Sequence, residues 1–203
     1  MNPKKLAVAA AVLAACGLAQ AQGPGESPWL VRVRAVNIDP VNKSDPIGGV
    51  GPANQVQVSS RNIPELDISY FFNRNIAAEL VLTYPQKHDV TLGGAPLGSF
   101  KQLPPTLTAQ YHFLPGRQFD PYLGAGLNYT RISSVNLGPV TLEKSSTGFA
   151  LQAGLDYRID RNWVINVDVK KVQIRSDAFV AGAKVTNVKL DPVLFGVGVG
   201  YRF

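Results

Sequence analysis

Cysteine, histidine and long apolar runs are all scarce in this chain of 203 residues. The single cysteine, Cys16, leaves no possibility of a disulfide within the chain. The two histidines, His88 and His112, are too few and too far apart for a clustered metal site, and we expect neither a metal nor a cofactor. The formal net charge of +6 is spread along the chain instead of forming a basic run, so we expect no binding to nucleic acid.

No apolar run after the N-terminal segment reaches the roughly 20 residues that a transmembrane helix needs. A chain without such a run can span a membrane only as a closed β-barrel, because backbone N–H and C=O groups cannot stay unpaired in lipid.

The N-terminus has the layout of a secretory signal peptide. Lys4 and Lys5 precede an apolar stretch from Leu6 to Ala15, and small residues follow up to Ala21. We therefore predict a signal peptide over residues 1–21 and a single mature domain over residues 22–203. Leu13 to Cys16 also fits a lipoprotein cleavage site, in which Cys16 would be acylated, and both cleavage routes stay open.

After the signal peptide, the sequence alternates apolar and polar residues with a period of two, which predicts strands. The expected strands cover residues 29–35, 65–72, 76–84, 106–113, 123–130, 148–157, 163–170 and 195–203. Their connections alternate between short ones (73–75, 114–120, 158–162) and long ones (39–61, 85–104, 132–146, 174–187). This pattern predicts an all-β fold, an eight-stranded antiparallel transmembrane β-barrel with short periplasmic turns and long external loops.

A soluble barrel would alternate as regularly, but three features favour an apolar face that is turned toward lipid. Most of the strand glycines lie on the polar face, where a narrow interior needs small residues. The terminal strand ends on an aromatic residue, Phe203, which is typical of chains that the outer-membrane assembly machinery recognises. Aromatic residues also collect beside the short turns and the chain ends, as an interface belt would: Trp29, Phe72, Phe113, Tyr157, Trp163, Tyr201 and Phe203.

The opposite face of the strands supplies the predicted lumen lining. It comprises Arg32, Arg34, Glu65, Asp67, Glu79, Val81, His112, Asp156, Asp168, Lys170 and Arg202. Eight strands leave an interior barely wide enough for side chains, which excludes a broad porin channel. Buried charges need partners, and we expect Arg32 and Arg34 to pair with Glu65 and Asp67 on the neighbouring strand. Such a lattice either plugs the barrel or acts as a polar gate. Lys170 either joins the lumen or reaches out to water or lipid phosphate.

No arrangement of residues indicates catalysis, because His112 faces inward while most serines lie in the connections, and we expect no enzyme. The first two long connections are rich in glycine and proline, which predicts mobile, turn-rich segments. The second and third also carry apolar residues: Leu92, Leu97, Phe100, Leu137, Val140 and Leu142. These residues either form an apolar entry funnel above the barrel or pack on one another and on the rim.

Five segments together resemble the outer-membrane protein W family of Gram-negative bacteria. They begin at Trp29, Asn75, Leu103, Pro121 and Leu190, and read WLVRVR, NIAAEL, LPPTL, PYLGAGLNYT and LDPVLFGVGVGYRF. The resemblance implies an integral outer-membrane barrel in contact with lipid and lipopolysaccharide, whose narrow lumen passes or binds small, mainly hydrophobic molecules. A barrel with a closed lumen, whose external loops bind a partner, is the alternative. Family members often place bulky apolar groups at the positions of Val81 and Lys170, and Lys170 departs from that pattern.

Overall fold

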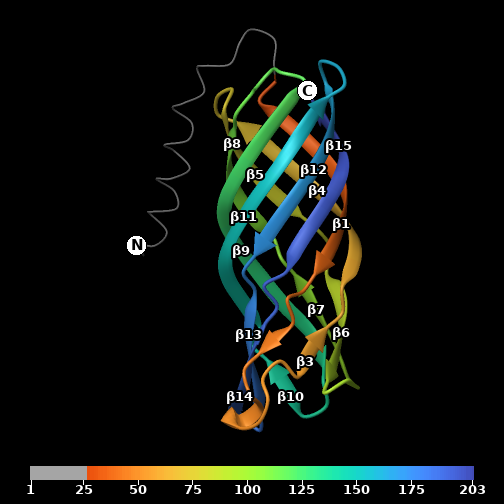
Figure 1. Cartoon of the computed structure of the whole chain (residues 1–203), viewed down its shortest axis with the longest axis vertical. Coiled ribbons are helices and arrows are strands. Elements are labelled where there is room, and N and C mark those ends of the chain that lie inside the picture. The colour runs from red at the N-terminus through yellow and green to blue at the C-terminus, as the bar shows by residue number, and fades with distance from the viewer. Residues whose placement is uncertain (1–26) are drawn as a thin grey trace, which may run out of the picture.

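The computed structural model describes residues 27–203, so the predicted signal peptide and Cys16 lie outside the described residues. The predicted fold is confirmed: eight strands close into an antiparallel barrel, with β15 paired to β1 (Figure 1). In order around the barrel they are β1 (Trp29–Asp39), β4 (Arg61–Phe71), β5 (Ile76–Leu82), β8 (Thr106–His112), β9 (Phe119–Asn136), β11 (Ser145–Arg158), β12 (Trp163–Val172) and β15 (Val193–Arg202). Between residues 27 and 203, no helix has the length and apolarity needed to cross a membrane.

Alternate residues of each barrel strand point into the barrel and away from it. On β1, Arg32 and Arg34 are 0% and 1% exposed, whereas Val33 between them is 54% exposed. The apolar side chains therefore form the outer surface, and the polar side chains fill the interior. A soluble protein buries its apolar face, so the reversed arrangement is that of a barrel surrounded by lipid.

The end of the barrel with the short turns, at the top of Figure 1, carries the aromatic belt. Asp160 orders one of these turns by accepting hydrogen bonds from the N–H groups of Asn162 and Trp163, each at 2.8 Å. Outward-facing rings meet edge to face, as in Trp29–Tyr70 and Trp163–Tyr201, with centroids 4.9 and 5.0 Å apart. All seven predicted belt residues lie at this end, and the structure adds Tyr70, Tyr111 and Phe119.

The opposite end bears a collar built from the long connections (Figure 1, bottom). Its elements are β2 (Lys43–Ser44), the 3-10 turn η2 (Ile47–Gly49), β3 (Val56–Val58), β6 (Gln86–Leu92), β7 (Ala95–Leu103), β10 (Val140–Leu142), β13 (Arg175–Val180) and β14 (Ala183–Lys189). The prediction of turn-rich segments is therefore wrong for residues 86–103, which form a β-hairpin, and for parts of residues 39–61. These short strands hold together because each pairs its backbone with a neighbour and buries one apolar face.

Two sheets make up the collar. The barrel sheet continues through β9 to β7, β6 and β3, while β10, β13, β14 and β2 form the other sheet. The edges of β2 and β3 are joined through side chains, because Val58 N–H donates to Asn42 Oδ1 at 2.7 Å and Ser44 N–H donates to Asn54 Oδ1 at 3.1 Å. Gly98 lets β7 approach β9, since a Cβ at this position would lie 1.9 Å from the carbonyl oxygen of Asn136.

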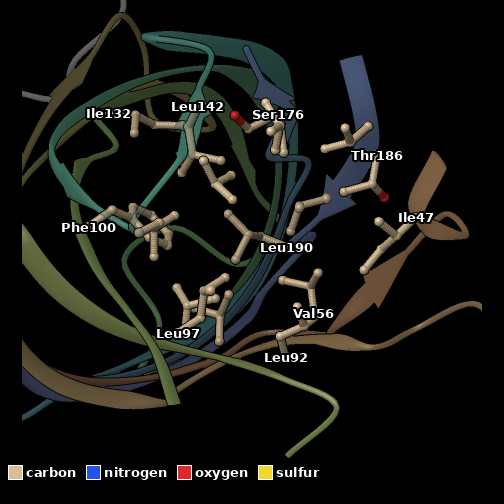
Figure 2. Close-up of a pocket in the computed structure, with 18 residues that line it drawn as sticks. Ile47, Val56, Leu92, Leu97, Phe100, Ile132, Leu142, Ser176, Thr186 and Leu190 are labelled. Atoms are coloured by element: carbon tan, nitrogen blue, oxygen red, sulfur yellow. The ribbon is translucent and has the colours of Figure 1, made fainter. Parts of the chain in front are cut away.

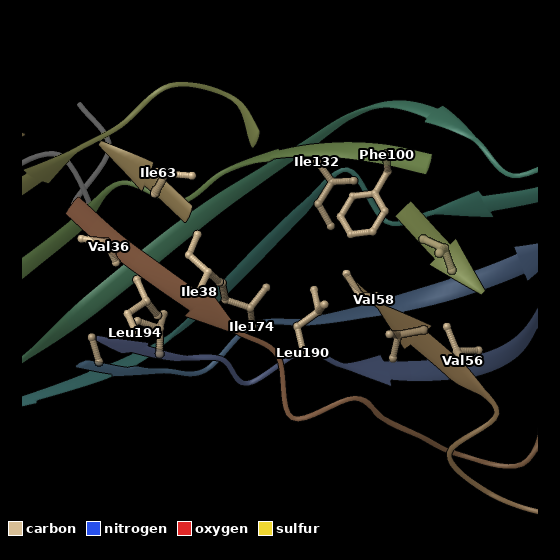
Figure 3. Packing of buried hydrophobic residues seen from close by; sticks show 14 of the residues in the cluster. Val36, Ile38, Val56, Val58, Ile63, Phe100, Ile132, Ile174, Leu190 and Leu194 are labelled. Carbon is tan, nitrogen blue, oxygen red and sulfur yellow. The ribbon is translucent and has the colours of Figure 1, made fainter. Parts of the chain in front are cut away.

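Buried hydrophobic residues link the barrel to the collar in one continuous cluster. Figure 3 shows it running from Val36, Ile38 and Leu194 at the mouth of the barrel to Val56 and Phe100 in the collar. The interior of the molecule is thus polar in the middle of the barrel and mainly apolar in the collar.

Candidate functional site

Arg32 and Arg34 form the centre of an ionic lattice inside the barrel. The guanidinium of Arg32 binds Glu79 of β5 at 3.0 Å and Asp156 of β11 at 2.5 Å. It also donates to the hydroxyl of Ser69 at 2.8 Å. One side chain of β1 is thus bonded to three other strands across the lumen.

Arg34 makes a second set of contacts one step further along β1. Its Nε lies 2.6 Å from Asp67, and its Nη atoms lie 3.3 Å from Glu65 and from Asp168 and 3.4 Å from Glu79. The expected pairing with Glu65 and Asp67 is therefore present for Arg34, whereas the ion pairs of Arg32 are to Glu79 and Asp156. Bonds to several carboxylates offset the large cost of burying a charge.

Lys170 lies inside the barrel, and this settles its orientation. It is 1% exposed, and its Nζ lies 3.0 Å from Glu65 and 3.7 Å from Asp168. The apolar inward position that the family resemblance implies for β12 is thus occupied by a paired charge. Val81, the other position in that comparison, is buried and lines the same small cavity as Lys170.

Neutral polar side chains complete the lattice. Gln152 donates to Glu79 at 2.9 Å and to Asp168 at 2.8 Å, and the hydroxyl of Tyr122 donates to Asp168 at 3.0 Å. Tyr122 reaches this position by lying over Gly154, where a Cβ would be only 2.3 Å from the ring. We did not predict Tyr122 as a lumen residue, although its spacing of two from Gly124 places it on the inward face.

The turn end of the lumen is closed by a second group of contacts. His112 Nδ1 lies 2.9 Å from Asp120, and its ring stacks on Tyr122 with centroids 4.9 Å apart. The guanidinium of Arg202 lies 4.3 Å from the ring centre of Phe71, and its Nε donates to the carbonyl of Ser27. All eleven predicted lumen residues are therefore buried inside the barrel.

The cavities above and below the lattice are too small to form a channel. Each has a volume of about 20 Å³, one lying beside Glu65 and Lys170 and the other beside Asp156 and Arg202. Such a volume holds about one water molecule. The lattice therefore fills the cross-section of the barrel instead of lining an open pore.

A larger cavity of about 190 Å³ lies in the collar, and Figure 2 shows side chains from both sheets pointing into it. Except for Ser176 and Thr186, its lining is hydrophobic: Ile47, Val56, Val58, Val90, Leu92, Leu97, Phe100, Ile132, Leu137, Val140, Leu142, Ala178, Val180, Val185, Val188 and Leu190. All six apolar residues expected either to form a funnel or to pack together line this cavity, so they pack around an open space.

The chemistry of this cavity suits an apolar molecule. A cavity of roughly 150 Å³ with such a lining stays free of water and binds benzene, since water would find no hydrogen-bond partners. No group of His, Cys, Asp or Glu within residues 27–203 is arranged to hold a metal ion. Most of the residues that line this cavity were not predicted from the sequence. The alternation of Val56 with Val58 and of Val188 with Leu190 is nevertheless a pattern that indicates strands with a buried apolar face.

His88 supports the wall of the cavity. Its ring stacks on Phe100 with centroids 5.8 Å apart, and its two nitrogens contact the carbonyl of Ser59 at 2.9 Å and Gln102 at 3.0 Å. Burial lowers the pKa of His88 below its ordinary value of 6.5, because a charged imidazolium would lose its hydration there.

Comparison with known proteins gives one family. The sequence model of a protein family, described as the OmpW family, matches residues 26–203. An outer-membrane protein of Sinorhizobium fredii, itself uncharacterized, is 45% identical over 188 residues, which is 88% of this chain and 81% of that protein. Outer membrane protein W of Vibrio cholerae is 33% identical over 211 residues, 95% and 96% of the two chains.

Two further similar proteins come from Pseudomonas aeruginosa. A dibenzothiophene metabolism operon protein is 30% identical over 193 residues, covering 88% of this chain and 90% of that protein. The crystal structure of the outer membrane protein OprG superposes with a TM-score of 0.78 at 27% identity, over 88% of this chain and 97% of that one.

Replacing Arg34 by Met should strongly destabilise the barrel. The substitution keeps much of the side-chain volume but leaves buried carboxylates without their cation, which costs about 3–5 kcal/mol. Urea-induced unfolding from lipid vesicles, followed by tryptophan fluorescence, measures this loss of unfolding free energy. Arg175→Met is the control: it removes an exposed ion pair with Asp191 and should cost less than about 1 kcal/mol. Equal effects of the two substitutions would contradict the lattice.

Acidification should loosen the collar through His88. Because its pKa is lowered in the folded protein, its contribution to stability is present above the unfolded value of 6.5 and is lost as the pH falls below it. Lowering the pH from about 7.5 to about 5 should therefore lower the protection factors of the β6 and β7 amides against hydrogen exchange, once the slower intrinsic exchange at the lower pH is divided out. His88→Gln should remove this loss of protection, and a variant that keeps it would show that another group is responsible.

Proposed function

The chain belongs to the OmpW family of outer-membrane β-barrels, and from this premise we propose that it binds small hydrophobic molecules in the collar cavity and passes them into the outer membrane. The observation that carries the proposal is the nearly all-hydrophobic lining of a cavity of about 190 Å³. The proposed role involves no chemical reaction.

The size of the cavity indicates the class of ligand. A space somewhat larger than one that holds benzene suits one or two fused rings or a short alkane. Burial of such a molecule is favourable by roughly 25 cal/mol for each Å² of apolar surface removed from water. The relative from a dibenzothiophene metabolism operon supports this class, since the compound in its name is an apolar molecule with fused rings.

The lattice restricts the path that a bound molecule can take. An apolar molecule that moved along the axis would have to break the ion pairs of Arg34 and Lys170, which lie directly below the small cavity beside Val81. Breaking buried ion pairs costs several kcal/mol, with nothing gained from an apolar ligand. Transfer therefore proceeds sideways through the wall of the collar cavity. There, only hydrogen bonds between paired backbone strands and contacts between apolar side chains have to separate.

Ala178→Phe tests the binding site by filling it. Ala178 lines the cavity and is 3% exposed, so the new ring would occupy the space that a ligand needs. The full chain in lipid nanodiscs, labelled at Ile, Leu and Val methyl groups, is titrated with naphthalene and followed by NMR. We expect saturable shifts at Val58, Leu137 and Leu190 in the wild type and their loss in Ala178→Phe.

The matched control is Ala125→Phe, which adds the same ring to the lipid-facing surface and should leave the shifts unchanged. Shifts that persist in Ala178→Phe, or that are as large at the lipid-facing Leu127 as in the cavity, would contradict the proposal. They would leave the closed barrel with partner-binding loops as the remaining function.

A further inference from the structure

Four cations lie near one another where the collar meets the barrel, on β4, β6, β7 and β9. This basic row consists of Arg61, Lys87, Lys101 and Arg131. Lys87 is directly opposite Lys101 in the β6–β7 pairing, and Arg131 lies two residues from Ser133, the partner of Lys101 on β9. Arg61 joins the row by donating from Nε to the carbonyl of Lys87 at 3.0 Å.

The side chains of the row point away from the cavity. Three of the cations, Lys87, Lys101 and Arg131, are exposed. The residue that directly follows each of them in the sequence is buried: His88, Gln102 and Ile132. Alternation along a strand therefore places these three cations on the outer face.

Three of the four cations in the row lack an acidic partner of the kind found elsewhere in the collar. Lys184, Lys189 and Arg175 each have a carboxylate within 3.3 Å. In the basic row, Arg61 pairs with Asp89, but Lys87, Lys101 and Arg131 have no ion pair with any residue from 27 to 203. Like charges directly opposite one another destabilise a sheet unless something neutralises them, so the arrangement points to an external anion.

The level of the row on the barrel identifies the kind of anion. Along β9, Leu127 and then Tyr129 face outward, 58% and 54% exposed, and Arg131 is the next outward residue. A tyrosine at the end of an apolar band marks the edge of the hydrocarbon layer. Two residues along a tilted strand amount to about 5 Å, so the row lies at the depth of lipid headgroups.

We propose that the basic row binds the phosphate groups of lipopolysaccharide, the lipid of the outer leaflet. The guanidinium of Arg131 matches two phosphate oxygens, and Lys87 and Lys101 add point charges on the same side. The site is separate from the collar cavity, since its side chains point outward from the same strands. It fixes the depth of the collar in the membrane.

Native mass spectrometry of the full chain in an uncharged detergent tests this site. The protein is titrated with lipid A that carries both phosphates, with lipid A from which the phosphates have been removed, and with inorganic phosphate. The triple variant Lys87→Gln/Lys101→Gln/Arg131→Gln should bind phosphorylated lipid A roughly tenfold more weakly than the wild type, because exposed charge pairs contribute modestly and three of them are lost.

A second triple variant, Lys43→Gln/Lys184→Gln/Lys189→Gln, removes the same charge from the other sheet of the collar and should keep wild-type affinity. Equal binding of phosphorylated and dephosphorylated lipid A would overturn the proposal. So would unchanged affinity in the first variant, which would leave the row to a different anionic partner, or an equal loss in the second, which would indicate nonspecific charge attraction. Binding of inorganic phosphate without lipid A would show a site for free anions only.

Discussion

The bonds that Arg32 and Arg34 make across the lumen are the constraint on which the rest of the structure depends. Two side chains of β1 reach carboxylates on β4, β5, β11 and β12. In a narrow, water-poor interior these charges are stable only while paired, so the strands that carry them are held at fixed positions around the barrel. The lattice that results fills the lumen, and a ligand site can then exist only above it.

The inward residues of individual strands show how the interior is divided into charged and apolar parts. The inward residues of β1 are Leu30, Arg32, Arg34, Val36 and Ile38, so a charged middle lies between apolar ends. β12 repeats this order from Val164 through Asn166, Asp168 and Lys170 to Val172. The apolar ends nearest the collar join its hydrophobic cluster, which extends the interior into the cavity. The outer face of the collar strands is free to carry a different function, that of the basic row.

The period of two was sufficient to predict the barrel, the direction of each strand face and the belt at the turn end. It also led to the pairing of Arg34 with Glu65 and Asp67, because those residues lie on adjacent strands. The contacts of Arg32 with Glu79 and Asp156 could not be predicted, since they cross the lumen and depend on its width and on the stagger of the strands. Part of the collar was missed because strands as short as Val56–Val58 have too few alternations to be distinguished from loops. The longer strand β6 was missed because its buried face carries Gln86 and His88 beside Val90, so apolar and polar residues do not alternate along it.

Ion conductance in a planar lipid bilayer tests most directly whether the lattice closes the lumen and leaves the ligand site in the collar cavity. Protein whose insertion has been verified should add no regular current steps to those of the bare bilayer, because water-sized gaps on either side of paired charges give ions no continuous path. Reproducible steps of uniform size from the wild-type chain would contradict this account, since they require an open aqueous route through the positions of Arg32 and Arg34.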